Sequence, residues 1–217
     1  MRAPSSTACL TGAAAMIFLT AVVSAQTARA GKIPEPGPAR LHYVVAPTGN
    51  EARYRVREVL VGLDFPNDAV GVTRSITGAL VVDTSGKAVE DSSRFTIDIS
   101  VLKSDKDKRD TYIRENVLHT SKFPTVELIP SFIKGVGGAP PASGTRAVEI
   151  VGNLKVHGSV HPTTWRGSAT FAGDEITGTI STAFTFTDIG LKKPSRAIIL
   201  SVEDTVKLEY DFHLIKR

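Results

Sequence analysis

Hydrophobic and polar residues alternate with a period of two along most of the chain after residue 40. In the C-terminal segment most even-numbered positions are apolar, namely Val202, Val206, Leu208, Tyr210, Phe212 and Leu214. Polar residues occupy the positions between them, and Asp204 is the one exception on the apolar side. Because successive side chains of a β-strand point to opposite faces, this pattern predicts a strand with one apolar and one solvated face.

The same alternation recurs in most of the remaining chain. It predicts strands over 76–82, 95–101, 148–156, 165–171 and 175–189, and less regular patterns predict strands over 41–45, 53–61 and 125–133. Alternation that leaves one face apolar is typical of antiparallel sheets covering a core. The sequence therefore predicts an all-β fold, and we expect an extended, eight-stranded antiparallel barrel.

One charged segment interrupts the strands. Residues Asp105 to His119 contain good helix formers and no Gly or Pro, and they place Ile113 and Val117 four residues apart. That spacing puts both apolar side chains on one face of a helix. We expect a single short α-helix that caps one end of the barrel.

The lengths of the predicted strands bear on function. Val202 to Leu214 would span roughly 40 Å at about 3.3 Å per residue, and an eight-stranded barrel is wide enough to be filled by side chains or to hold one slender ligand. A tall barrel therefore favours a long, thin molecule. Several predicted inward positions carry small residues, namely Gly78, Gly152, Gly167, Ala169 and Gly178. They are equally consistent with a lumen and with tight packing or bulges.

The first thirty residues have the pattern of a secretory signal peptide. Arg2 precedes an apolar stretch that is too short to span a bilayer, and small residues follow at Ser24-Ala25 and Ala28-Arg29-Ala30. We expect cleavage after Ala25 or Ala30, export to the periplasm or beyond, a Pro-rich tether over 31–40, and a β domain over 41–217. Cleavage removes the only cysteine, Cys9, which excludes thiol nucleophiles, thiolate metal sites and disulfides.

The charge balance changes with that cleavage. Arg2 and Arg29 are the only charged residues before residue 31, so the formal net charge falls from +4 to about +2. This small excess does not favour nucleic-acid binding.

Four short stretches resemble the motifs of the YceI-like family, in order and with plausible spacing. They are Lys108-Arg109-Asp110 with Ile113, Lys122 to Leu128, Ile150 to Gly158 followed by His161-Pro162, and Thr187 to Leu191. The chain departs from the family pattern at Tyr54 to Glu58 and at Val117-Leu118, and Leu63 to Val72 appears as an added loop. The resemblance implies a lipocalin-like barrel in the bacterial periplasm, whose lumen binds a polyisoprenoid or a similar long apolar chain. It also implies a family that is not generally regarded as enzymatic.

The parity of the strands predicts which side chains line the lumen. These are Ile97, Ile99, Ile150, Leu154, Trp165, Phe171, Ile180, Phe184, Val206, Leu208, Tyr210 and Phe212. Burying one isoprene unit against such residues is worth roughly 4 kcal/mol, so three or four units would offset an association cost of about 4 to 15 kcal/mol. Arg109, Asp110 and Ile113 would hold the helix as a lid over one end.

Candidate chemistry elsewhere in the chain is sparse. His157 and His161 lie four residues apart, but Gly158 and Pro162 favour a strand end and turn over a metal-binding helix, so we expect no metal and no cofactor. Neighbouring carboxylates such as Asp174-Glu175 and Glu203-Asp204 point to opposite faces of a strand and cannot flank one bond. The histidines His42, His119 and His213 have no evident partner carboxylate, and no G-x-S-x-G motif is present.

Three functions stay open from the sequence. The first is an exported carrier, monomer or homodimer, that sequesters or transports a polyprenyl chain, a quinone or a similar lipid, with transient contact to a membrane surface. The second is a filled barrel that acts as an interaction or stress-response module and docks through Arg53, Arg55 and Arg57. The third is a lipid-processing enzyme, although we expect no catalysis.

Overall fold

The computed structural model describes residues 39–62, 65–136 and 140–217, which belong to one compact unit, Pro36–Arg217. The predicted signal peptide and nearly all of the predicted tether lie outside these residues. The elements are β1 Arg40–Val45, β2 Glu51–Leu60, β3 Asn67–Thr73, β4 Ile76–Asp83, the short 3-10 helix η1 Glu90–Ser92, β5 Arg94–Asp98, α1 Asp107–Tyr112, the π-helix η2 Ile113–Val117, β6 Thr125–Lys134, β7 Ser143–Val156, β8 Ser159–Ala172, β9 Glu175–Thr185 and β10 Ile199–Lys216.

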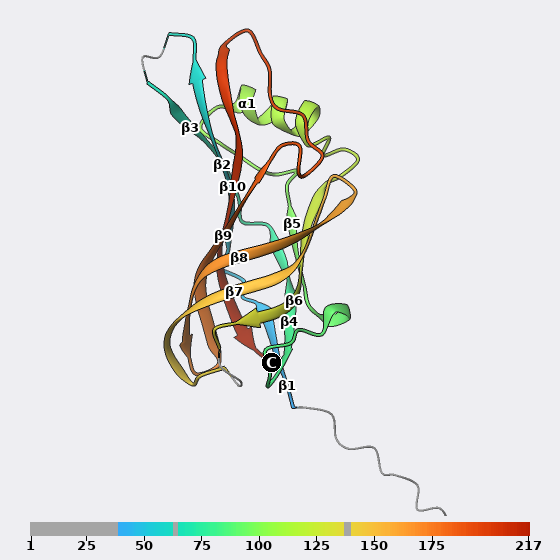
Figure 1. Cartoon of the computed structure of the whole chain (residues 1–217), viewed down its shortest axis with the longest axis vertical. Coiled ribbons are helices and arrows are strands. Elements are labelled where there is room, and N and C mark those ends of the chain that lie inside the picture. The colour runs from blue at the N-terminus through green and yellow to red at the C-terminus, as the bar shows by residue number, and fades with distance from the viewer. Residues whose placement is uncertain (1–38, 63–64, 137–139) are drawn as a thin grey trace, which may run out of the picture. The chain divides into compact units, whose positions relative to one another are not determined.

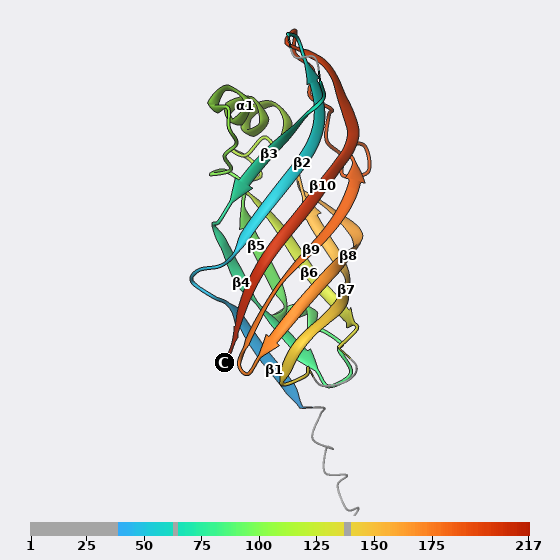
Figure 2. The same ribbon diagram turned by 90° about the vertical axis from the view of Figure 1, so that its left-hand side faces the viewer.

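Eight antiparallel strands form a closed ring, as the alternation predicted. Its order is β1-β4-β5-β6-β7-β8-β9-β10, and β10 closes it by pairing with β1 through Val45 and Leu214. Further along, β10 pairs instead with β2, which pairs with β3. The β2–β3 hairpin thus extends one end of the ring, beside α1 (Figures 1 and 2). We call this the upper end, and the end that holds β1 and the C-terminus the lower end.

Asn50 fixes the break between β1 and β2. Its side-chain amide donates to the carbonyl oxygens of Ala46 at 2.9 Å and His213 at 3.2 Å. Its Oδ1 accepts from the backbone N–H of His213 and from the Tyr210 hydroxyl, both at 3.0 Å. One buried amide therefore satisfies backbone groups that the sheet leaves unpaired where β10 changes partner.

The helical segment also agrees with the prediction. Six residues of α-helix continue into five of π-helix and end at Val117. Asp110, only 2 % exposed, accepts hydrogen bonds from the backbone N–H and the hydroxyl of Ser104 at 2.9 and 2.6 Å. This contact holds the first turn of α1 to the segment before it.

Several predicted boundaries were wrong. Strands β7, β8 and β10 begin before the predicted residues 148, 165 and 202, and three further segments differ as follows. The segment interpreted as an added loop, Leu63 to Val72, contains β3, whose inward positions Ala69 and Gly71 are too small to signal a strand. The strand expected to reach Ile189 ends at Thr185, where Asp188 and Thr185 exchange hydrogen bonds of 2.9 and 3.1 Å across a turn. The strand expected to reach Val101 ends at Asp98, whose carboxylate accepts from the backbone N–H and hydroxyl of Ser100.

The inward-facing glycines serve tight packing. A Cβ at Gly167 would lie 1.8 Å from the carbonyl oxygen of Thr179, and one at Gly178 would lie 2.2 Å from that of Ser168. Any larger residue would therefore push β8 and β9 apart. Among the described residues, no helix is long and apolar enough to cross a bilayer.

Candidate functional site

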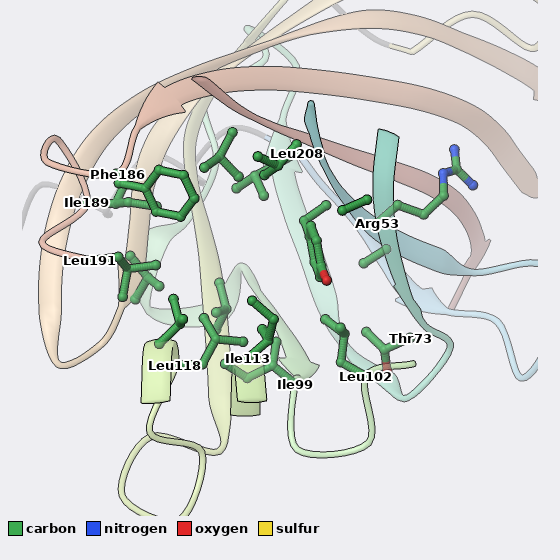
Figure 3. A pocket seen from close by; sticks show the side chains of 18 of the residues that line it. Arg53, Thr73, Ile99, Leu102, Ile113, Leu118, Phe186, Ile189, Leu191 and Leu208 are labelled. Carbon is green, nitrogen blue, oxygen red and sulfur yellow. The ribbon is translucent and has the colours of Figure 1, made fainter. Parts of the chain in front are cut away.

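An apolar cavity lies at the upper end of the barrel, below the β2–β3 hairpin. It has a volume of about 160 Å³ and an overwhelmingly apolar lining. Figure 3 shows Phe186, Ile189 and Leu191 on one side, Ile99, Leu102 and Ile113 along another, and Leu208 across from them. Strands, the π-helix region and the connection between β9 and β10 therefore all contribute to its wall.

The strand walls of the cavity form because every second residue of each strand faces the lumen and most of these residues are apolar. Val56 on β2 and Val206 and Leu208 on β10 face inward. Opposite them lie Ile113 and Leu118 of the helical segment, and Ile189 and Leu191 of the connection between β9 and β10. Val56, Val117, Phe186 and Val206 form a small buried cluster that is separate from the main core. The upper cavity thus lies where helix and sheet meet.

A second, smaller cavity of about 60 Å³ lies nearer the lower end. Its lining includes Leu80, Phe95, Val148 and Phe171. Tyr210 lines both cavities, and its ring lies edge-on to Phe95 with ring centroids 5.8 Å apart. Most of the barrel interior is filled by side chains, and free volume is concentrated at the upper end.

An ion pair stands in the wall of the upper cavity. Arg109 on α1 donates to Glu58 Oε1 on β2 at 2.6 Å and also pairs with Asp105. Both side chains of the Arg109–Glu58 pair are nearly buried, 12 % and 7 % exposed. Burial lowers the pKa of Arg109, but the charges and hydrogen bonds of Glu58 and Asp105 more than offset this and leave it raised. Arg109 therefore keeps its charge, and its pair with Glu58 ties the helix to the sheet across the cavity.

Two residues that line the cavity each carry a polar atom that is itself buried and lacks a hydrogen-bond partner among the described residues. These atoms are the hydroxyl of Tyr54 and the indole Nε1 of Trp165, which is 4 % exposed. Burial raises the pKa of Tyr54 to about 12, so its hydroxyl keeps its proton. Both groups can donate a hydrogen bond, and unsatisfied buried donors are costly.

The residues predicted to line the lumen divide between the two cavities. Seven line the upper one: Ile97, Ile99, Leu154, Trp165, Val206, Leu208 and Tyr210. Ile150, Phe171, Ile180 and Phe212 line the lower one, together with Tyr210. Phe184 lines neither and packs, partly buried, against the core.

The predicted lid residues meet at the upper end. Arg109 and Ile113 line the cavity, while Asp110 supports the start of the helix from behind. Sequence reasoning missed the wall supplied by Glu58, Leu102 and the turn residues Ile189 and Leu191. The resemblance of residues 187–191 to a family motif was the signal that pointed to that turn.

The other candidate groups lie apart from this site. No cluster of three or more metal-ligating side chains occurs in the described residues, and His157 contacts His119, with Nε2 and Nδ1 3.0 Å apart. The expectation that His213 lacks a partner carboxylate was wrong, because its Nε2 lies 3.2 Å from Glu175 Oε2. The alternation places both of those residues away from the lumen.

The arginine stripe on β2 is largely neutralised. Arg53 pairs with Glu51, Glu209 and Asp211, and Arg55 and Arg57 both pair with Asp68. These ion pairs reduce the charge that the stripe offers to a partner.

Solved structures with the same fold include three bacterial proteins. A polyisoprenoid-binding domain from Saccharophagus degradans, implicated in plant cell wall breakdown, is 12% identical with a TM-score of 0.62, covering 82% of this chain and 99% of its own. BcnA of Burkholderia cenocepacia is 13% identical (TM-score 0.56, 76% and 95% covered), as is the YCEI protein of Campylobacter jejuni (0.56, 73% and 91%). No match is found among curated proteins.

The family model of the YceI-like domain matches residues 43–214. This range begins within β1 and ends within β10, so it includes nearly the whole ring and all residues that line the two cavities. Since the match spans most of the chain, the chain belongs to the YceI-like family.

Proposed function

We propose that this protein is an exported carrier that holds an isoprenoid or similar apolar lipid in the upper cavity for sequestration or transport. The observation that carries the proposal is an apolar cavity of about 160 Å³ at the upper end of the barrel. The polyisoprenoid-binding domain of Saccharophagus degradans has the same fold, and the pattern of residues 1–30 supports export.

The volume of the cavity limits what it can enclose. A cavity of about 150 Å³ in another protein binds benzene, so the upper cavity encloses about one isoprene unit in this conformation. We infer that the end of a lipid chain enters first. The remainder would extend towards the mouth between α1 and the β2–β3 hairpin, or the helix would move to admit it.

The two unsatisfied donors refine the ligand class. A pure hydrocarbon would leave the Tyr54 hydroxyl and the Trp165 indole N–H without a partner, whereas a carbonyl or hydroxyl oxygen could accept from either. Because both atoms are buried, a lipid with a polar acceptor, such as an isoprenoid quinone or ketone, would satisfy them only when these side chains turn towards it. Nothing in this chemistry requires a reaction, and we expect no catalysis.

The test is extraction of gently purified protein with organic solvent, followed by uptake of a fluorescent isoprenoid probe. Trp165 is the only tryptophan, so energy transfer from it to the probe reports entry into the upper cavity. Leu208→Ser should weaken uptake about tenfold, while Lys207→Ser, a neighbouring position on the opposite face, should leave it unchanged. Finding neither co-purified lipid nor uptake would reject the proposal and favour a filled interaction module.

A further inference from the structure

The upper end carries a second feature that ligand binding in the cavity does not explain. Among the described residues, large exposed hydrophobic side chains are Val61, Phe65, Val101, Phe132, Val160, Ile198 and Leu200. Four of them lie at one end of the sheet: Val61 just after β2, Phe65 shortly before β3, and Ile198 and Leu200 at the start of β10. We call Val61, Phe65, Ile198 and Leu200 the apolar tip; they are 54 %, 79 %, 61 % and 65 % exposed.

The tip is held together by the sheet. The backbone N–H of Val61 donates to the carbonyl oxygen of Ile198 at 2.9 Å, and Leu60 pairs with Ile199. Figures 1 and 2 both place the end of β2 and the start of β3 beside the start of β10, at the end of the domain beyond α1. The tip is therefore a projecting edge of paired strands.

Both faces of this edge are apolar. The alternation that governs the barrel is lost over Val59-Leu60-Val61 and over Ile198-Ile199-Leu200. Ile199 lines the upper cavity, so the next strand residue, Leu200, points to the opposite face. Ile198, in the turn just before β10, is exposed as well. A strand that is apolar on both sides is typical of one that is buried on both sides, yet the face that carries Leu200 is exposed to solvent.

Charge beside the tip indicates what covers it. The segment from Leu191 to Val202 contains Lys192, Lys193 and Arg196 and no acidic residue, and the exposed Glu203 and Asp204 follow it on β10. All three cations are exposed, and none forms a salt bridge within the described part of the chain. Arg196 lies over the Tyr112 ring, 4.8 Å from its centroid, on the helix that borders the cavity. Cations around an inserting apolar edge suit the interface of an anionic lipid bilayer.

We propose that the apolar tip and its cations dock the protein onto an anionic membrane surface, with the mouth of the upper cavity facing the lipid. This inference rests on the proposed function, because a lipid carrier must take up or release its ligand at a bilayer. A second copy of the chain is a poorer occupant. Even at about 150 Å² per large side chain, four partly exposed residues offer at most roughly 600 Å², below the about 800 Å² per partner of a stable interface.

The experiment is co-sedimentation of residues 31–217 with vesicles, since the apolar run of residues 1–30 would bind vesicles by itself. Vesicles of phosphatidylcholine mixed with phosphatidylglycerol should bind the protein, and Phe65→Ser with Leu200→Ser should lower the partition coefficient by about tenfold or more. Lys192→Gln with Lys193→Gln should lower it about tenfold on anionic vesicles only. Phe132→Ser is the matched control, because Phe132 lies towards the end of β6 away from the tip.

The outcomes separate this proposal from the proposed function. Tip variants that lose vesicle binding but take up the isoprenoid probe from detergent would support both. Vesicle binding without any uptake by the unaltered protein would reject the carrier function alone. Absent vesicle binding, binding that the tip variants retain in full, or a dimer that these variants convert to monomer would overturn membrane docking.

Discussion

The two ends of the barrel are built differently, although they share the same long strands. At the lower end the ring is closed by strand pairing, the glycines of β8 and β9 bring backbones together, and the cavity is about 60 Å³. At the upper end β3 has β2 on one side and a single bridge from Val72 to Lys103 on the other. Helix and turn side chains complete that wall, and the cavity there is about 160 Å³.

The difference shows where a barrel of this type can keep empty space. Neighbouring strands place side chains at regular intervals, so alternating residues of complementary size can fill the lumen. Where strands give way to a helix and a turn, side chains approach from irregular directions and leave volume. The binding site thus follows from the interruption of the sheet.

The largest effect that tests this comparison is on stability at the lower end. Ile180 is 1 % exposed in the main core and borders only the smaller cavity, so Ile180→Ala should cost about 3 to 4 kcal/mol in unfolding free energy. The half-buried Leu191 at the upper end should lose only about 1 kcal/mol as Leu191→Ala, because its deletion enlarges space that already exists. Urea unfolding measures both. Equal losses would show that the two ends are equally well packed.

The ion pair across the upper end should give the next largest effect. Glu58→Ala leaves the nearly buried Arg109 without its β2 partner and should cost about 3 kcal/mol, at the lower end of the range for breaking a buried pair. Amide exchange in α1 should quicken more than exchange in β7 and β8. The control is Asp68→Ala, whose exposed pairs with Arg55 and Arg57 should contribute less than about 1 kcal/mol. A small loss for Glu58→Ala would mean that packing alone holds the helix.

The lower end was more predictable from sequence than the upper end, for a physical reason. A period of two is sufficient to assign β7, β8 and β10, because sheet geometry alone determines which of their residues face inward. β3 was missed because Ala69 and Gly71 carry little hydrophobic signal. The Glu58–Arg109 pair joins residues 51 positions apart, and no local pattern encodes such a contact.

The candidate site was predictable in part for the same reason. Trp165, Val206 and Leu208 were identified by parity, since a strand residue of known parity faces a known side. The wall formed by Ile189 and Leu191 depends on a turn closed by Asp188 and Thr185, where parity has no meaning. Only the resemblance to a family motif marked that turn.

Filling one cavity at a time tests the proposed division of function between the two ends. Val206→Phe inserts a ring into the upper cavity and should lower uptake of the isoprenoid probe about tenfold, equivalent to about 1.4 kcal/mol of binding free energy. Val148→Phe places the same ring in the lower cavity and should leave uptake unchanged, although overpacking could cost about 1 to 3 kcal/mol of stability. Titration at matched folded fractions separates the two effects. Loss of uptake only in Val148→Phe would place the ligand at the lower end.

The smallest expected effect concerns pH at the upper end. His157 in the β7–β8 turn contacts His119, just after the π-helix, and lies against Phe123 with ring centroids 4.5 Å apart. Burial, together with the nearby His119 and Lys122, lowers the pKa of His157 below its ordinary value of 6.5. Protonation is therefore less favourable in the folded state. The contribution of His157 is present above pH about 6.5 and is lost as the pH falls through the lowered pKa.

Replacing His157 should remove this pH dependence. Asn tolerates the positive φ of 50° at position 157, so His157→Asn removes the ring while keeping the turn. The unfolding free energy of the variant should change less between pH 7 and 5 than that of the unaltered protein, and His42→Gln, an exposed position on β1, should leave the pH dependence as it is. Because the imidazole is near the surface, solvent screens the effect and keeps it small. An unchanged slope in His157→Asn would assign the acid sensitivity of the upper end to other groups.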